Sequence, residues 1–222
     1  MDTRKHYEFF NPNDSPPIHI IGCGAIGSTI ATQVARLGID EIHLWDFDHV
    51  ESKNIANQTF NFGDIGRLKT ETIRDYINNI NPGCKVHLHE EYTAQILHGI
   101  VFTTVDSILV RKNIIKINRY NREAVAYIDV RMGLTSGQVY TATFLKQSSI
   151  KSLLESMNFT DEEAKASTPV SACGTVLNVR PNVTALSSYA VAELMHIIKN
   201  KQPKNKLIMA DVYHQTLNTI EF

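Results

Sequence analysis

The stretch Ile18-His19-Ile20-Ile21-Gly22-Cys23-Gly24-Ala25-Ile26-Gly27 decides the fold of this chain. Its first four residues have the composition of a buried strand, and a GxGxxG turn follows them directly. Residues 25–37 then have helical periodicity and end at Gly38, a typical residue after a helix C-terminus. A glycine-rich turn between a strand and a helix lets backbone N–H groups approach phosphate oxygens closely. The predicted nucleotide contacts are Gly22, Gly24, Ala25, Ile26 and Gly27. The alternative is a turn that only permits close packing of the helix on the strand.

A second predicted strand, residues 41–46, brings acidic side chains to the same end of the sheet. Asp46 ends this strand, where a carboxylate can accept hydrogen bonds from ribose hydroxyls. Asp48 is either a second polar contact or a turn residue. These features indicate an adenosine nucleotide, but they do not separate ATP from NAD.

The segment after the second strand adds amides and a positive charge. Asn54, Asn57 and Gln58 supply the amides, and Asp64-Ile65-Gly66-Arg67-Leu68-Lys69 supplies the charge. Asp64 is the predicted N-cap of a helix over residues 65–80, which puts Lys69 on the first turns. Because ligands bind at the carboxyl ends of strands in open α/β sheets, these groups are expected where a triphosphate would lie. A hydride-transfer enzyme has no need of them.

The rest of the chain continues as alternating elements and then changes character. Further predicted strands are 85–89, 99–104, 124–129 and 138–145, with a hairpin at 207–212 and 217–220; further predicted helices are 107–121, 149–157 and 182–199. The alternation predicts an α/β fold, a Rossmann-like and mostly parallel sheet with antiparallel C-terminal strands. We expect one domain over residues 1–222, with an N-terminal arm at 1–17 and a polar, acidic mobile loop at 158–174.

Composition excludes several classes of function. The chain has 222 residues, 43% hydrophobic and 20% charged, with a net charge of −1, so its bulk charge favours neither nucleic acid nor an anionic membrane. It has no apolar run of the roughly 20 residues that a membrane span needs, and its N-terminus does not resemble a signal peptide. Cys23, Cys84 and Cys173 form no CxxC pair, which argues against structural zinc and for a reducing cytoplasm. The nine histidines are scattered, and no metal other than Mg²⁺ is expected.

A family resemblance follows from the order of these motifs. GxGxxG, Asp46-Phe47-Asp48, the asparagine–glutamine segment, Asp64 to Lys69, and Thr104-Val105-Asp106-Ser107-Ile108-Leu109-Val110-Arg111 together resemble the ThiF/MoeB family over about residues 18–131. This family includes the ubiquitin-activating enzymes. The resemblance implies adenylation of the C-terminal carboxylate of a small protein or peptide, with Mg-ATP consumed and pyrophosphate released. It also implies a homodimer and a partner that is a β-grasp ubiquitin-like or sulfur-carrier protein ending in Gly.

The resemblance assigns roles to individual residues. By position, Gly22, Gly24 and Gly27 match the glycines of the family's nucleotide turn, and Asp46 matches the residue that binds the ribose. Asn54 matches an asparagine on the phosphate side, and Lys69 matches the lysine that holds the phosphates. Asp106 matches the aspartate that binds magnesium. Lys69 and Asp106 are therefore the predicted catalytic pair. Arg111 is expected to anchor its helix or to pair with a carboxylate.

Two positions leave alternatives open. The family has an arginine where this chain has Asn57, and Arg4, Arg67 or Arg131 are candidates to replace it. Without that arginine, the alternative is a protein that binds nucleotide and acts as a scaffold without catalysing a reaction. An NAD-dependent oxidoreductase is a weaker alternative, because that function accounts for neither Lys69 nor Asp106. Cys173, at the end of the acidic segment, is a candidate nucleophile for a thioester, or else a small packed residue.

Overall fold

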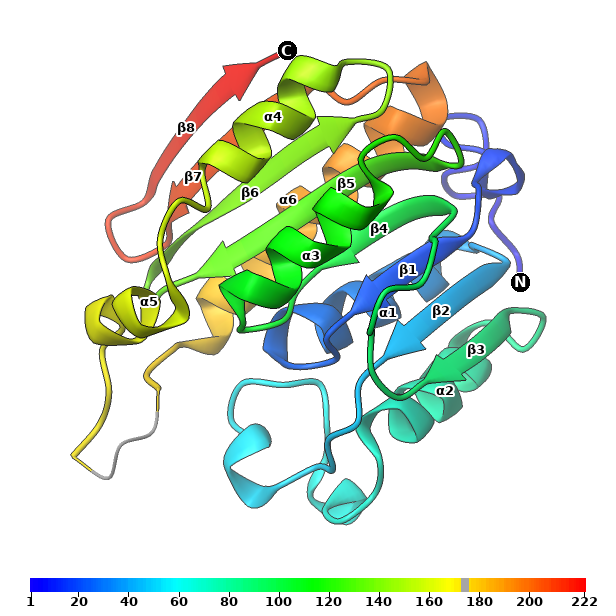
Figure 1. The fold of residues 1–222 in the computed structure, drawn as a ribbon. Coiled ribbons are helices and arrows are strands. Elements are labelled where there is room, and N and C mark those ends of the chain that lie inside the picture. Colours follow the sequence, from blue (N-terminus) through cyan, green and yellow to red (C-terminus); the bar gives the residue numbers. More distant parts are fainter. Residues whose placement is uncertain (173–175) are drawn as a thin grey trace.

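The protein is built on one eight-stranded sheet with the order β3-β2-β1-β4-β5-β6-β7-β8 (Figure 1). The computed structural model describes residues 1–172 and 176–222. The strands are β1 Ile18–Ile21, β2 Glu41–Trp45, β3 Lys85–His89, β4 Gly99–Thr103, β5 Ala124–Met132, β6 Ser136–Thr143, β7 Asn205–Asp211 and β8 Thr216–Glu221. The first five strands pair in parallel, and β5 to β8 pair antiparallel. The predicted fold class, mostly parallel with antiparallel C-terminal strands, is confirmed.

Helices cover both faces of this sheet. They are α1 Ala25–Leu37, α2 Lys69–Ile80, α3 Ile108–Asn118, α4 Gln147–Glu155, α5 Asp161–Ser167 and α6 Arg180–Asn200. Helices α1, α2 and α6 lie on one face, and α3 and α4 lie on the other (Figure 1). Each face therefore has its own apolar core. The larger core, under α1, α2 and α6, includes Ile20, Leu44, Ile73 and Leu186, and the smaller one, under α3 and α4, includes Val101, Ile114, Tyr127 and Leu153.

The start of α2 differs from the prediction. The predicted helix began at residue 65 after an Asp64 cap, but α2 begins at Lys69. Gly66 has φ +91°, and Ile65 has ψ 129°, so neither residue can continue a helix. Their backbone is used instead to join two loops: Gly66 N–H donates to Val50 O at 2.8 Å, and Val50 N–H donates to Arg67 O at 2.8 Å. Lys69 is thus the first residue of its helix rather than a residue one turn inside it.

The acidic segment 158–174 also differs from the prediction, since it contains helix α5. Thr160 and Glu163 form a capping box at its start, each side chain bonding the other's backbone N–H. The predicted long loop is therefore part helix. The other elements agree with the predictions to within a few residues, and Gly38 ends α1 with φ +87° as expected.

Five of the nine histidines lie together in space, namely His19, His43, His87, His89 and His98, so the prediction that the histidines are scattered is wrong for these five. His19, His43 and His87 lie side by side in register on β1, β2 and β3. The parallel register of three strands brings them together, and nothing local in the sequence reveals that register. Within the described residues, no helix is long and apolar enough to cross a membrane.

Candidate functional site

The glycine turn joins β1 to α1, and its three glycines have different roles. Gly22 has φ +95°, and a Cβ there would lie 2.8 Å from the backbone carbon of Thr104. A Cβ on Gly27 would lie 1.9 Å from Gly22 O. These two glycines are required for packing, as the alternative interpretation held. Gly24, the N-cap of α1, has no atom within 4 Å of its ideal Cβ position. Its backbone therefore faces open space at a helix N-terminus, where N–H groups without helical partners can bind an anion.

A cavity of about 790 Å³ opens in front of this turn. It collects almost all of the predicted site residues: Gly22, Gly24, Ala25, Ile26, Asp46, Asp48, Asn54, Asn57, Gln58, Lys69 and Asp106. Gly27 lies behind the cavity wall in α1 and does not line it. Cys173 lies outside the described residues. Side chains from four separate parts of the sequence thus converge on one space at the carboxyl ends of β1, β2 and β4.

Asp46 links the glycine turn to the lysine side of the cavity. Its carboxylate accepts a hydrogen bond from Cys23 N–H at 2.7 Å and another from Asp48 N–H at 2.8 Å. Burial raises the pKa of Asp46, and the charge of Lys69 opposes that rise. The carboxylate is therefore fixed in place by backbone donors at the point where β2 ends.

Lys69 is a buried cation and not a solvated surface lysine. Its side chain is 8% exposed, and its Nζ lies 2.6 Å from the carboxylate of Asp48, which is 53% exposed. Lys69 N–H also donates to Asp48 O at 2.9 Å, so backbone and side chain hold the same pair together. Because Asp48 reaches solvent, it can turn away while the ammonium stays in the cavity. A phosphate oxygen could then take the place of the Asp48 carboxylate on Lys69.

The amides of the cavity leave two acceptors without partners. Asn54 Oδ1 accepts from Glu51 N–H at 2.8 Å, which holds the short 3₁₀ turn Ser52–Asn54. Asn57 Oδ1 and Gln58 Oε1 are buried and have no hydrogen-bond donor among the described residues. Buried polar atoms are almost always paired. These two oxygens therefore mark a place where a ligand or an ordered water would donate.

An arginine that the sequence analysis missed lies beside Asn57. Arg180, the first residue of α6, donates from Nη1 to Asn57 O and to Thr29 Oγ1, each at 3.0 Å. Burial lowers the pKa of this guanidinium, and no carboxylate among the described residues pairs with it. The arginines that the sequence suggested are engaged elsewhere. Arg4 pairs with Asp2, Arg67 with Asp75, and Arg131 with Asp129.

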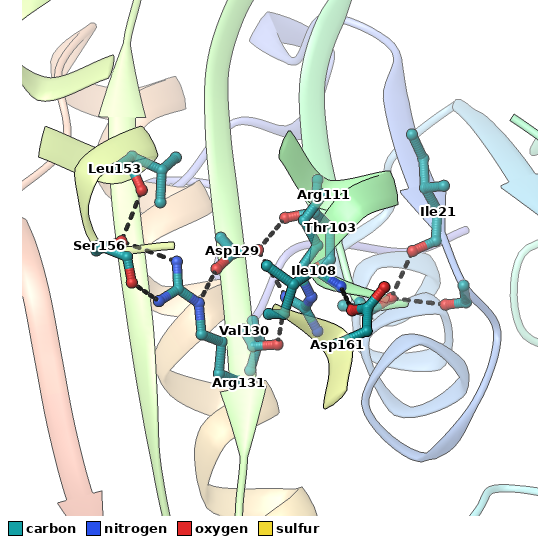
Figure 2. Close-up of polar contacts among 12 residues, drawn as sticks. Ile21, Thr103, Ile108, Arg111, Asp129, Val130, Arg131, Leu153, Ser156 and Asp161 are labelled. Carbon is teal, nitrogen blue, oxygen red and sulfur yellow. Dashed lines mark hydrogen bonds and ion pairs between the residues drawn. The ribbon is translucent and has the colours of Figure 1, made fainter. Parts of the chain in front are cut away.

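Arg111 and Arg131 approach one buried carboxylate from two sides (Figure 2). Asp129 on β5 is fully buried, and it lies 2.6 Å from Arg111 Nη1 and 2.6 Å from Arg131 Nε. Arg111 Nη1 also donates to Thr103 O at 3.0 Å and to Val130 O at 2.9 Å. Burial alone would raise the pKa of Asp129, but the two guanidiniums outweigh it and hold the pKa below its usual value. The structure confirms that Arg111 pairs with a carboxylate and anchors its helix.

Asp106 is exposed on the loop between β4 and α3. Ser107 next to it caps α3, and its Oγ donates to Asp161 at the start of α5. Ile108 N–H donates to the same carboxylate (Figure 2). Asp161 thereby fixes the loop that carries Asp106. A second cavity of about 930 Å³ lies beyond this loop. The two cavities share Asp106, Ser107, Arg111, Met132 and Val176 as wall residues.

The donor set near the nucleotide turn fits magnesium. Mg²⁺ is usually held by one or two carboxylates together with substrate phosphates and water. Asp106 supplies an exposed carboxylate, and Asp48 supplies a second one if it leaves Lys69. The described cysteines are not part of the site chemistry. Cys23 is fully buried with its pKa raised by burial, and burial raises the pKa of Cys84 to about 12.

A glycine turn at a helix N-terminus, a fixed carboxylate after the second strand and a buried lysine around one cavity are features typical of nucleotide-binding α/β domains. The family model of the ThiF family matches residues 14–222, and the chain belongs to that family. The predicted resemblance is confirmed.

Individual relatives match shorter stretches. The tRNA threonylcarbamoyladenosine dehydratase of Haemophilus influenzae is 38% identical over 76 residues, 34% of this chain and 29% of that protein. The adenylyltransferase and sulfurtransferase uba4 of Aspergillus niger is 32% identical over 96 residues, 43% of this chain and 20% of that protein. The ubiquitin-like modifier-activating enzyme 5 of Caenorhabditis elegans is 31% identical over 72 residues, 32% of this chain and 17% of that protein. This chain thus spans less than a third of each relative.

Solved structures share the whole fold. The structure of E. coli MccB with ATP has a TM-score of 0.68 at 21% identity and covers 95% of this chain and 65% of its own. The structure of E. coli MccB with MccA-N7isoASN has a TM-score of 0.72 at 20% identity and covers 95% of this chain and 66% of its own. Identities this low show that the fold is shared and show nothing further.

Proposed function

We propose that the protein adenylates the C-terminal carboxylate of a small protein or peptide. The observation that carries this proposal is the buried Lys69 ammonium, which shares one cavity with the open helix N-terminus at Gly24. A dinucleotide oxidoreductase has no use for that cation. Family membership supports an ATP-dependent reaction, and the ATP-bound MccB structure supports ATP as the nucleotide.

Each part of the cavity has a place in the proposed reaction. The backbone at Gly24 and the start of α1 would bind phosphate oxygens, and Asp46 would accept from the ribose hydroxyls. Lys69 would exchange Asp48 for a phosphate oxygen. When bound by Asp106, magnesium would supply charge neutralisation on the phosphates. The acyl carboxylate oxygen would bond to the α-phosphorus while the bond from phosphorus to the pyrophosphate oxygen breaks.

The second cavity is the proposed route for the acyl substrate. It meets the nucleotide cavity at Asp106, Ser107, Arg111, Met132 and Val176, so a chain terminus lying in it would reach the α-phosphate side. The MccB structures with MccA support a peptide as one class of substrate, and the relative named ubiquitin-like modifier-activating enzyme supports a β-grasp protein as another. A partner ending in Gly is part of the proposal because the family resemblance implies it. A homodimer and a cytoplasmic location are part of the same proposal.

Arg180 is our candidate for the charge that the family supplies at the position of Asn57. It is partly buried beside Asn57, it has no acidic partner among the described residues, and it starts a long helix that holds it in position. Two hydrogen bonds to Asn57 O and Thr29 Oγ1 leave the other guanidinium nitrogens able to meet an anion. The neutral Asn57 remains the one observation that favours a nucleotide-binding scaffold without turnover. Cys173 remains a proposed thioester nucleophile after adenylation.

The test is pyrophosphate release from Mg-ATP with β-grasp proteins and peptides that end in Gly. Lys69→Ala and Asp106→Ala are each expected to lower turnover by about 10²–10³-fold, because each removes a charge that acts on the phosphates. Arg180→Gln tests the replacement cation in the same assay. Lys53→Ala is the matched control, because Lys53 lines the same cavity but is exposed and paired with Glu51. Near-normal turnover in both the Lys69 and Asp106 variants would overturn the proposed mechanism, and tight ATP binding without turnover of any acyl substrate would establish the scaffold instead.

A further inference from the structure

The face of the sheet over β1, β2 and β3 has no crossover helix. Residues 90–98 connect β3 to β4 without a helix, and the connection passes over β1 (Figure 1). On this face His19 and His43 are buried, whereas the side chain of His87 on the edge strand is 48% exposed. His19, His43 and His87 form a row across it, with ring centroids 4.2 Å apart between His19 and His43 and 4.4 Å apart between His43 and His87.

The outer end of this row holds a compact set of metal-binding atoms. Glu41 Oε1 lies 3.2 Å from His43 Nε2 and 3.7 Å from His87 Nε2, and the donor atoms of all three residues lie within 4.8 Å of one another. Zinc bonds of about 2.0–2.1 Å in tetrahedral geometry put neighbouring ligand atoms about 3.3–3.4 Å apart. The two separations from Glu41 are close to that value. The rings of His43 and His87 are stacked with an interplanar angle of 16°, so their lone pairs run side by side, and the half-exposed His87 ring would have to turn out of the stack for both nitrogens to bind one ion.

A further histidine supports this set from behind. His43 Nδ1 lies 3.1 Å from His89 Nε2, so His43 can donate its Nδ1–H there while its Nε2 keeps a free lone pair. A metal-bound histidine usually donates its other ring N–H to a carboxylate, a backbone carbonyl or water, and here a ring nitrogen of His89 takes that place. Half of the His87 side chain (48%) and a third of the Glu41 side chain (35%) are exposed, which gives an ion a path from solvent.

We propose that Glu41, His43 and His87 form a binding site for a divalent transition metal ion of the zinc type, separate from the nucleotide cavity. None of these three residues lines that cavity. Two imidazoles and one carboxylate suit Zn²⁺ better than Mg²⁺, which prefers oxygen ligands. The bound ion would join β2 to the edge strand β3. A water molecule completes a tetrahedral shell in such a three-ligand site.

The only tryptophan of the chain is a built-in reporter for this site. Trp45 stacks on His89 with ring centroids 3.9 Å apart, and its Nε1–H donates to His19 Nδ1 at 3.2 Å. The full chain, free of any histidine tag, would be titrated with Cu²⁺ while Trp45 fluorescence is followed. Zn²⁺ affinity would be measured in parallel by competition with a chromophoric chelator. One equivalent of zinc and quenching of Trp45 by copper are the expected results.

Variants decide whether the ion occupies this site. His87→Gln and Glu41→Gln are expected to weaken zinc at least tenfold each, and both side chains are exposed enough to be replaced without unfolding the protein. His214→Gln is the matched control, because His214 is an exposed histidine 3.1 Å from the carboxylate of Asp211. It lies near β7 and β8, at the edge of the sheet opposite β3. Asp106→Ala tests whether zinc binds the nucleotide cavity instead. No zinc binding at micromolar concentration, or binding that only Asp106→Ala or His214→Gln reduces, would overturn the proposal.

Discussion

Two glycines three residues apart should respond to the same substitution in opposite ways. Gly24 and Gly27 belong to one turn, and each would gain a single methyl group on change to alanine. A Cβ on Gly27 would lie 1.9 Å from Gly22 O, whereas a Cβ on Gly24 would have no atom within 4 Å. Gly27→Ala should therefore damage the fold, and Gly24→Ala should damage nucleotide binding.

The cost at Gly27 can be worked from the structure. Alanine in a helix is favoured over glycine by roughly 0.5–1 kcal/mol. Forcing an extra carbon into a packed contact typically costs about 1–3 kcal/mol and occasionally more, and the obstacle here is backbone, which cannot rotate away. Because the obstacle puts the cost at the upper end of that range, about 3 kcal/mol, the net loss after the helix gain is about 2–2.5 kcal/mol, which corresponds to a fall in melting temperature of about 4–10 °C for a chain of this size.

The cost at Gly24 should be seen mainly with ligand. The backbone there has φ −74° and ψ −148°, so φ suits alanine while ψ lies just outside the usual β region, and the methyl group would project toward the cavity in front of α1. The free energy of unfolding of the free protein should fall by no more than about 1 kcal/mol, less than for Gly27→Ala. Scanning calorimetry of both variants, with and without Mg-ATP, measures the two effects together. Either of two results would refute these assignments: a Gly27→Ala variant that melts like the unmodified protein, or a Gly24→Ala variant that Mg-ATP stabilises as much as it does the unmodified protein.

Two further predictions concern buried groups. Asp129→Asn leaves Arg111 and Arg131 without their carboxylate, which should cost about 3–5 kcal/mol at pH 7. The fold holds the pKa of Asp129 below its usual value, so the stabilisation by its carboxylate is present above the unfolded pKa and is lost as pH falls through the folded pKa. The difference in unfolding free energy between the variant and the unmodified protein, measured in urea, should therefore narrow below about pH 4. A difference that does not change with pH contradicts the assignment. Iodoacetamide at neutral pH should label Cys173 ahead of the other two thiols, since Cys23 is fully buried and burial raises the pKa of Cys84 to about 12. Equal labelling of Cys23 and Cys173 in the native protein, followed by mass spectrometry, would refute this.

The sequence predicted those features that depend on nearby residues. Strand, glycine turn and helix at residues 18–37 follow from local periodicity, and the structure has them at Ile18–Ile21 and Ala25–Leu37. The predicted start of α2 was wrong because Asp64 is a residue type that often caps helices, whereas the φ of +91° at Gly66 goes with hydrogen bonds to Val50 in another loop. Helix α5 was missed because its polar sequence has no apolar stripe to signal a helix.

The parts of the site that sequence reasoning missed depend on distant contacts. Arg180 meets Asn57 only because α6 packs across α1, and no local pattern connects the two residues. The histidine row depends on the register of β1, β2 and β3, which the spacing of histidines along one strand cannot reveal. The alternating position of His43 and His87 among apolar strand residues was the one available signal, because it already put both on a face opposite the main core.

Helix α6 makes the nucleotide cavity depend on the order in which the chain is synthesised. The glycine turn, Asp46 and Lys69 all leave the ribosome early, but Arg180 and the wall residue Asn178 follow much later. Until the 21 residues of α6 arrive, α1 lacks the helix that later packs across it. The nascent N-terminal part thus holds every recognisable motif around an unfinished cavity and exposes apolar surface. A chain cut short before residue 180 would be a substrate for chaperones and proteases rather than a weak enzyme.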